Sequence, residues 1–212
     1  MRPSGIIFDL DGVLLDTVPA HFEAWQRSFH AFGVPFDETR YREDVDGRPV
    51  RDGARAVIGD RDAATLDALV AMKERLYTEI VESGQFEVFS DVPTLLQDLS
   101  RRGIPMAVAS GSNQARRLIA LAGLTELFKA VVCGDDVVHG KPAPDIFLTA
   151  AERLGLPPAR CLVVEDSIAG LSAAKTGGFI PIALLRIRAS EDPPGAMRTI
   201  SSLGDLRSEF SF

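Results

Sequence analysis

Two aspartates separated by one residue follow the first apolar run of the chain, in Asp9-Leu10-Asp11-Gly12. Residues at i and i+2 of a strand point to the same side, so we expect these two carboxylates to lie close together. Like charges at short range repel, and burying them without a partner is costly. A divalent cation relieves that cost and also lets a carboxylate attack a phosphorus centre. The pair therefore predicts metal-assisted phosphoryl chemistry at Asp9 and Asp11.

Three further polar motifs come later in the chain, each at or soon after the end of a predicted strand. They are Ser110-Gly111-Ser112-Asn113, then Lys141-Pro142, then Glu165-Asp166. Each motif alone is weak evidence, because Asp-x-Asp-Gly turns are common and Gly140-Lys141 lacks the spacing of a phosphate-binding P-loop. The four motifs in this order are far more specific than any one of them.

The elements that must position these motifs alternate between strand and helix. Apolar runs predict buried strands, and amphipathic stretches closed by glycine predict helices. The expected strands are residues 4–9, 104–109, 130–133, 161–164 and 179–185, the last being the final core strand; the expected helices are 92–102, 114–122, 144–154 and 168–176. This alternation predicts an α/β fold, with a Rossmann-like, doubly wound parallel sheet and helices on both faces. In such sheets ligands bind at the carboxyl ends of the strands, where all four motifs are expected.

An all-helical insert is expected between the first two motifs. Residues 17–85 carry almost no strand signal, and helices are predicted over 19–33, 51–58 and 62–83, with a short one near 38–42. The predicted domains are therefore a core of residues 1–15 and 86–212 and an inserted helical domain of residues 16–85. From Arg186 the chain is polar, with a short helix expected around 203–210.

Composition excludes several classes of function. The chain has 212 residues, is 46% hydrophobic, and has no apolar run long enough to cross a bilayer and no signal-type N-terminus, so we expect a cytoplasmic protein. A net charge of −7 argues against nonspecific binding of nucleic acid or anionic membranes. Cys133 and Cys161 are expected to be buried, inert thiols. No exposed apolar stripe stands out, so a monomer or weak homo-oligomer is expected.

With these motifs the sequence resembles the haloacid dehalogenase-like phosphatase superfamily over essentially its whole length. The resemblance implies that Asp9 is a nucleophile that forms an aspartyl-phosphate, and that Asp11 is first the general acid and then the base. Ser110 would hold the phosphoryl oxygens, and Lys141 would neutralise their charge. The dehalogenase branch lacks the second aspartate, so Asp11 favours phosphate chemistry.

The same resemblance implies a Mg²⁺ cofactor. Asp166, with Glu165 nearby, would hold the ion together with Asp9 and the backbone carbonyl of Asp11, a set of hard oxygen ligands. Gly111, Ser112 and Asn113 are candidates for binding the substrate phosphate, because the first turn of the helix after Ser110 can offer backbone N–H groups.

The helical insert resembles the small cap of the β-phosphoglucomutase-like subfamily. The closer likeness is carried by Asp16-Thr17, His21, Trp25, Gly47, Lys73 and Tyr77. It implies that His21 and Lys73 approach the active site from the cap, and that Gly47 lies in a substrate loop. Without the resemblance, His21 is equally well explained as a structural residue near a hinge, and Lys73 as a solvated helix charge.

One position departs from the mutases. They hold a distal phosphate with an arginine three residues after the cap glycine, and here that position is Val50. Arg48 and Arg51 flank it and are candidates for binding the substrate, since either could reach the site if the loop shifts, although a displaced guanidinium is not equivalent. We therefore place a Mg²⁺-dependent phosphatase of a small phosphorylated metabolite, with a sugar phosphate as the expected substrate, ahead of a β-phosphoglucomutase. A noncatalytic binding module is the third alternative, and it is disfavoured because every chemical position is filled.

Overall fold

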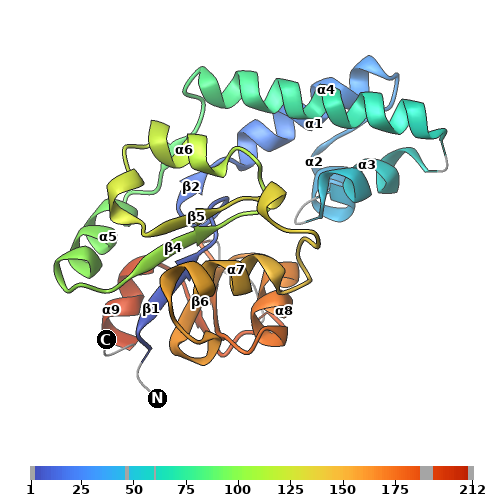
Figure 1. The fold of residues 1–212 in the computed structure, drawn as a ribbon. Helices are drawn as coiled ribbons and strands as arrows, with labels where there is room; N and C mark the ends of the chain where they lie inside the picture. The colour runs from blue at the N-terminus through green and yellow to red at the C-terminus, as the bar shows by residue number, and fades with distance from the viewer. Residues whose placement is uncertain (1–2, 46–47, 60, 187–192, 210–212) are drawn as a thin grey trace. The chain divides into compact units, whose positions relative to one another are not determined.

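The computed structural model describes residues 3–45, 48–59, 61–186 and 193–209 of the chain (Figure 1). The chain divides into two compact units. One comprises Met1–Leu15 together with Val88–Phe212, and the other is Asp16–Glu87. Two short strands, β2 (Leu15–Asp16) and β3 (Glu87–Val88), pair where the chain passes from one unit to the other.

The first unit is built on a six-stranded parallel sheet with the order β5-β4-β1-β6-β7-β8. In register, Phe8 of the central strand pairs with Val108 on one side and Val164 on the other. The strands are β1 (Gly5–Phe8), β4 (Met106–Ala109), β5 (Ala130–Val132), β6 (Cys161–Glu165), β7 (Ile180–Leu184) and β8 (Arg198–Ile200). Every residue of β1, β4 and β6 is buried, as expected for strands covered on both faces.

The helices of this unit follow the strands in the alternating order that the sequence predicts. They are α5 (Val92–Arg101), α6 (Ala115–Leu121), α7 (Asp145–Leu154), α8 (Ile168–Thr176) and α9 (Leu206–Glu209). Side chains of α7 and α8, such as Phe147 and Ala173, pack with Ile7 and Ala107 of the sheet in one apolar cluster. The predicted α/β class is confirmed, and both cysteines are buried as expected.

The second unit consists of helices that enclose an aromatic core. Its elements are α1 (Val18–Ala31), α2 (Glu38–Arg40), the π-helix Tyr41–Val45, α3 (Val50–Ile58) and α4 (Ala63–Glu82). Asp62 caps α4, because its carboxylate accepts hydrogen bonds from the backbone N and the hydroxyl of Thr65. The rings of Trp25 and Phe29 stack with their centroids 5.1 Å apart, so the apolar stripe of α1 forms the centre of this core.

One strand of the six-stranded sheet was missed by the sequence prediction, which took residues 179–185 as the final core strand, and the two-residue strands β2 and β3 were not predicted either. Arg198–Ile200 forms β8, which pairs in parallel with β7, and Leu185 N donates to Ile200 O at 2.9 Å. Only three residues long, with an exposed arginine at its start, β8 shows too little alternation to be recognised. It lies within the stretch that was expected to be a polar tail.

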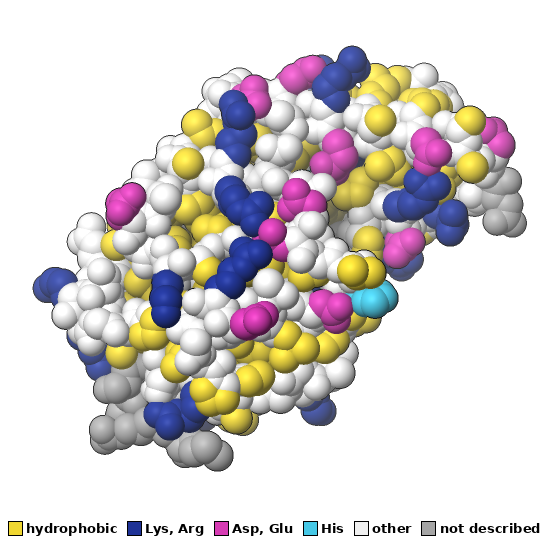
Figure 2. Space-filling view, viewed as in Figure 1, with side chains coloured by type: hydrophobic (Ala, Val, Ile, Leu, Met, Phe, Trp, Pro, Cys, Tyr) yellow, Lys and Arg dark blue, Asp and Glu magenta, His cyan; other side chains and the backbone are white. Residues whose placement is uncertain are grey.

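No helix among the described residues is both long enough and apolar enough to span a membrane. On the face shown in Figure 2, basic and acidic side chains are interspersed, and neither sign gathers into one large patch.

Candidate active site

The strand β1 delivers Asp9 to the carboxyl edge of the sheet, where the backbone N of Asp9 donates to Val164 O at 2.9 Å. The side chain of Asp9 is buried, with the residue 6% exposed. Gly12 follows with φ at +75°, and a Cβ added there would lie 1.9 Å from Asp166 Oδ2. Glycine is therefore required at this turn, because it lets the loop after β1 approach the acidic end of β6.

Lys141 supplies a positive charge to this edge of the sheet from the loop before α7. Its Nζ donates to Asp9 Oδ1 at 2.6 Å and also contacts Glu165 Oε1. The ammonium lies 5.0 Å from the centroid of the Phe147 ring, which is a cation–π contact. Lys141 thus bridges the ends of β1 and β6, and its charge is matched by two carboxylates.

Glu165 ends β6 and is fully buried. Besides the contact of its Oε1 with Lys141, its Oε2 accepts a hydrogen bond from Ser167 N at 2.7 Å. A Cβ at Gly170 in α8 would come within 1.8 Å of Oε1, so the glycine makes room for the carboxylate. Both oxygens of Glu165 are therefore engaged, while Asp166 beside it is exposed.

Ser110 joins β4 to the same site. Its hydroxyl donates to Asp11 Oδ2 at 3.1 Å and accepts from Ser112 N at 3.0 Å. Gly134 holds this loop from the other side, because a Cβ there would come within 2.3 Å of Gly111 O and 2.9 Å of Asn113 Oδ1. The serine is fully buried, so the hydrogen bond fixes the carboxylate of Asp11 from the neighbouring strand.

The helix after Ser110 was predicted over residues 114–122, and it begins one residue later in the structure. The helix α6 begins at Ala115, and Ser112 and Asn113 lie in the loop before it. The N–H of Ser112 is used by Ser110, and the hydroxyl of Ser112 accepts from Gln114 N at 3.2 Å. Local hydrogen bonds of this kind favour turns over helix, which explains the later helix start.

Three carboxylates at the edge could hold a metal ion. Asp9, Glu165 and Asp166 each offer an oxygen, and these oxygens all lie within 4.8 Å of one another. Hard oxygen donors of this kind suit Mg²⁺ better than softer metals. Asp11 adds a fourth carboxylate at this edge, and two of the four share the ammonium of Lys141, so a divalent cation would offset the remaining negative charge.

Burial also perturbs the ionisation of this cluster. It raises the pKa of Asp9 to about 8, with the charges of Glu165 and Asp11 adding to the rise and that of Lys141 opposing it. Burial alone would lower the pKa of Lys141, but the carboxylates of Asp9 and Glu165 raise it above its ordinary value. Strong shifts of this kind are typical of functional sites.

Two helices of the second unit, α1 and α4, carry its candidate residues. Lys73 is 1% exposed, so the interpretation of it as a solvated charge is wrong. Its Nζ lies 4.7 Å from the centroid of the Tyr77 ring and 5.5 Å from that of Trp25, and it donates to Glu74 Oε1 at 3.0 Å. The ring of His21 stacks on that of Tyr77 with centroids 4.0 Å apart. His21, Trp25, Lys73 and Tyr77 thus form one aromatic and cationic cluster.

The arginines that flank Val50 both have partners within the helical unit. Arg48 Nη2 donates to Glu43 O at 3.1 Å, and Arg51 Nη1 binds the carboxylate of Asp67. Gly47, the predicted loop glycine, lies outside the described residues.

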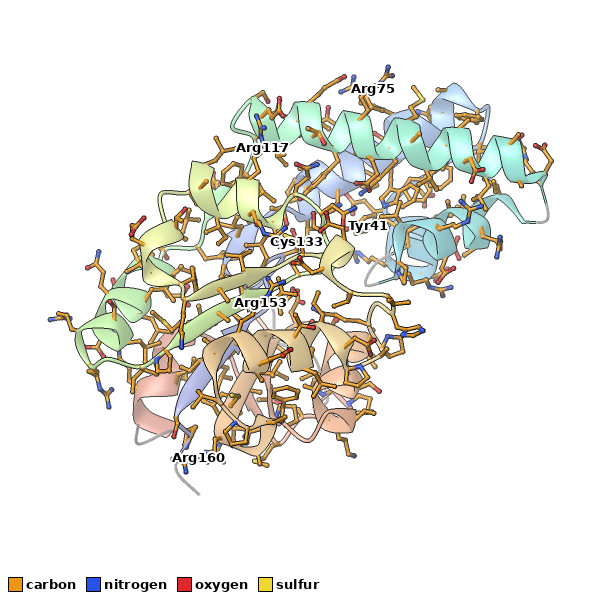
Figure 3. All side chains as sticks on the ribbon, in the orientation of Figure 1. Tyr41, Arg75, Arg117, Cys133, Arg153 and Arg160 are labelled. Carbon is orange, nitrogen blue, oxygen red and sulfur yellow. The ribbon has the colours of Figure 1, made fainter. Side chains whose placement is uncertain are left out.

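A second group of possible ligands, Cys133, Asp135 and Asp136, lies after β5. Figure 3 shows Cys133 near the end of this strand and Arg153 on α7. Asp136 accepts from Cys133 N at 2.8 Å and forms ion pairs with Arg153 and Arg116, so it stabilises the turn and its charge is already matched. Burial raises the pKa of the Cys133 thiol, which further disfavours the thiolate that a metal needs.

One residue near the site was not singled out by the sequence. Arg186 follows β7 and donates from Nη2 to Val13 O at 2.6 Å, next to the loop that carries Asp11. The available signal was weak, because it consisted of a single arginine after a buried strand.

Comparisons with known proteins agree with this geometry. A model of the haloacid dehalogenase-like hydrolases matches residues 3–178. Fructose-1-phosphate phosphatase YqaB of Escherichia coli is 38% identical over 181 residues, covering 84% of this chain and 94% of the relative. Beta-phosphoglucomutase of Mycobacterium tuberculosis is 32% identical over 202 residues, covering 82% and 77%. The crystal structure of CbbY from Rhodobacter sphaeroides in complex with phosphate has a TM-score of 0.83 at 28% identity, covering 97% and 96%.

Proposed function

The chain belongs to the haloacid dehalogenase-like hydrolase family, and on that basis we propose that it is a phosphatase of a small phosphorylated sugar. The observation that carries the proposal is the convergence of Asp9, Asp11, Ser110 and Lys141 at the carboxyl edge of one parallel sheet. This set contains a nucleophile, an acid/base and a cation for the phosphoryl charge, which a phosphoryl transfer needs.

In the proposed mechanism Asp9 attacks the phosphorus of the substrate and forms an aspartyl-phosphate. Asp11 gives its proton to the leaving sugar oxygen and then takes one from the water that hydrolyses the intermediate. The hydrogen bond from Ser110 to Asp11 supports this role, because it orients the carboxylate. Lys141 offsets the negative charge of the transferred group, and Gly111, Ser112 and Asn113 are proposed to bind its oxygens.

We propose Mg²⁺ as the cofactor, held by Asp9, Asp166 and the backbone carbonyl of Asp11. When bound, it would polarise the phosphoryl group and screen the repulsion between the phosphate and the carboxylates. Glu165 is proposed to support the site by holding Lys141, since both of its oxygens are engaged. His21 and Lys73 of the helical unit, with Gly47, are proposed to contribute to substrate choice, and we propose that this unit acts as a cap domain.

A phosphomutase is the second candidate, because a beta-phosphoglucomutase is among the similar proteins. A mutase must bind a second phosphate, and the position of the expected arginine holds Val50. The two neighbouring arginines have partners at Glu43 and Asp67, and moving either to a phosphate would break those contacts. Hydrolysis is therefore the better supported reaction.

Two assays test the proposal. The protein is incubated with Mg²⁺ and a panel of phosphorylated sugars that includes fructose 1-phosphate, and free phosphate is measured. In the second assay it receives β-glucose 1-phosphate with the 1,6-bisphosphate, and glucose 6-phosphate is measured. We expect phosphate release in the first assay and no isomerisation above that of the Asp9→Asn variant in the second. Isomerisation without release of phosphate would favour the mutase instead.

A further inference from the structure

The side chain of Arg186 binds the two peptide carbonyls that follow Asp11. Its Nε donates to Gly12 O at 3.2 Å, and its Nη2 donates to Val13 O at 2.6 Å. Arg186 lies just beyond β7 (Ile180–Leu184), so the parallel topology brings it to the same edge of the sheet as Asp11. A charged donor makes such hydrogen bonds stronger than neutral ones.

The guanidinium of Arg186 is itself held in place from the opposite side. Asp91, next to the start of α5, accepts from its Nη1 at 3.2 Å and from its Nη2 at 3.1 Å, which is a bidentate ion pair. The Phe89 ring lies under the guanidinium, with its centroid 3.6 Å from Cζ. Asp91 Oδ2 also accepts from Ser202 Oγ at 3.0 Å and from Leu203 N at 2.9 Å. The C-terminal segment thus fixes Asp91, and Asp91 fixes the arginine.

In the loop after Asp11, the backbone amides and the backbone carbonyls have different hydrogen-bond partners. Inside the loop, the amides of Val13, Leu14 and Leu15 all donate to Leu10 O, at distances of 2.9 to 3.3 Å. The carbonyl of Leu14 is bound by Phe89 N at 3.2 Å, and those of Gly12 and Val13 by Arg186. Removing the arginine would leave two carbonyls without these donors and free the peptides next to Asp11 to rotate.

We propose that Arg186, held by Asp91 and the C-terminal segment, is a positioning residue that sets the orientation of Asp11 for proton transfer. The inference rests on the proposed phosphatase function. The contacts of Arg186 with the loop are to backbone carbonyls, so it acts through Asp11 and not on the substrate. Proton transfer is sensitive to geometry, and a misplacement of about 1 Å can cost about 100-fold in rate.

The kinetic test compares Arg186→Met and Arg186→Lys with a matched control, Arg207→Met. Arg207 also comes from the C-terminal segment and donates to a carbonyl, Thr94 O at 2.8 Å, with Asp98 at 3.7 Å, and both of these partners lie on α5 rather than in the loop. For Arg186→Met we expect kcat to fall by about 100-fold while KM changes by less than about 3-fold. Arg186→Lys should recover part of the rate, because lysine keeps the charge and can donate to a carbonyl but lacks the planar fork that engages both carbonyls and Asp91 together. The control should retain wild-type kcat.

Hydrogen exchange measured by mass spectrometry provides a readout that needs no substrate. The amides of Val13 to Leu15 should exchange about 10-fold faster in Arg186→Met than in wild type, while peptides of β6 and the Arg207→Met control should not change. The proposal is overturned if kcat falls no further than in the control, or if its fall matches a loss of folded protein in a thermal melt. If wild type releases no phosphate from any sugar phosphate, the proposed function fails, and exchange of the loop still decides whether Arg186 holds it.

Discussion

Lys141 and Lys73 are both largely buried, one in each unit, but their surroundings differ. The ammonium of Lys141 lies between the carboxylates of Asp9 and Glu165, which are themselves buried. That of Lys73 lies over the ring of Tyr77, and its ion pair is with Glu74, whose side chain is 34% exposed. Because a buried charge needs compensation, the first unit supplies opposite charge and the second supplies aromatic rings and one partly solvated carboxylate.

The difference separates two kinds of site. A charge held between carboxylates at the end of a sheet is locked into a network, which suits a group that must stabilise a transition state. A charge over aromatic rings is less completely paired, and so it retains the capacity to bind an anionic ligand. We infer that the first cluster performs the chemistry and that the second contributes to binding. The following changes test this comparison.

Asp9→Asn should have the largest effect, because it removes the proposed nucleophile and one carboxylate partner of Lys141. We expect phosphate release to fall by at least about 10⁴-fold. The fold should persist, since asparagine has the same shape and its amide oxygen can still accept from Lys141. The change is measured by phosphate release and by circular dichroism. Asp135→Asn, an exposed aspartate with a side chain 61% accessible, is the control and should keep full activity. Near-normal turnover of Asp9→Asn would refute the assignment.

Removal of divalent cations should impair the cluster around Lys141 and leave the cluster around Lys73 unchanged. Dialysis against EDTA is expected to lower phosphate release by about 10³-fold, and added Mg²⁺ should restore it, because the carboxylates repel a phosphate without a cation. Asp166→Asn should raise the Mg²⁺ concentration needed for half-maximal activity. Asp135→Asn, in the second acidic group, should not change it. Full activity after EDTA treatment would exclude the proposed cofactor role.

Lys141→Met should lower both rate and stability, because it leaves Asp9 and Glu165 buried without their cation. The expected loss is about 10²- to 10³-fold in kcat, and about 3–5 kcal/mol in the free energy of unfolding. Urea denaturation and steady-state kinetics measure the two effects. An unchanged midpoint of unfolding would show that the carboxylates do not need the lysine, and the contrast between the two units would then disappear.

Lys73→Met should have a smaller and different effect. Methionine keeps an unbranched chain of similar size among the rings, so the free energy of unfolding should change by less than about 1 kcal/mol. If Lys73 binds the substrate phosphate, KM should rise by about 10-fold while kcat changes little. A variant that loses kcat with KM unchanged would place Lys73 in the chemistry and contradict the comparison.

Asp91→Asn tests the partly buried ion pair with Arg186, and its expected effect on stability is the smallest of these. Burial raises the pKa of Asp91, but hydrogen bonds from Arg186 and Leu203 outweigh it and hold this pKa below its ordinary value. An acid with a lowered folded pKa adds stability above its unfolded pKa of about 3.9, and this contribution is lost as the pH falls through the folded pKa. The melting temperature of Asp91→Asn should therefore depend less on pH below about 5 than that of wild type. If the melting temperatures of the variant and of wild type changed in parallel with pH, the ion pair would contribute nothing to the pH dependence of stability.

Much of the fold could be predicted from the sequence, because local signals agreed with the tertiary arrangement. Apolar runs such as residues 161–164 predicted buried strands. Asp62 predicted the start of α4, and in the structure it is the residue that caps this helix. The strand β8 could not be predicted, since its three residues form a strand only by pairing with β7. Pairing of this kind depends on distant residues that periodicity does not report.

The candidate site was predictable where its residues follow strands, and not where they act through contacts. The topology of a parallel sheet brings Asp9, Ser110 and Glu165 to one edge, and the order of motifs was enough to expect it. The burial of Lys73 could not be predicted, because a lysine on a helix is ordinarily solvated. The bonds of Arg186 to backbone carbonyls leave no mark in sequence spacing, so only coordinates reveal them.

Trapping the phosphoryl group on the enzyme tests the central claim most directly. The protein is mixed with Mg²⁺ and a sugar phosphate that it hydrolyses, and is then quenched with borohydride, which reduces an acyl phosphate to an alcohol. Peptide mass spectrometry locates the reduced residue. The account predicts that residue 9 is converted to homoserine, and that omitting the sugar phosphate prevents the conversion. Conversion of a different residue, with residue 9 intact in protein that turns over, would contradict it.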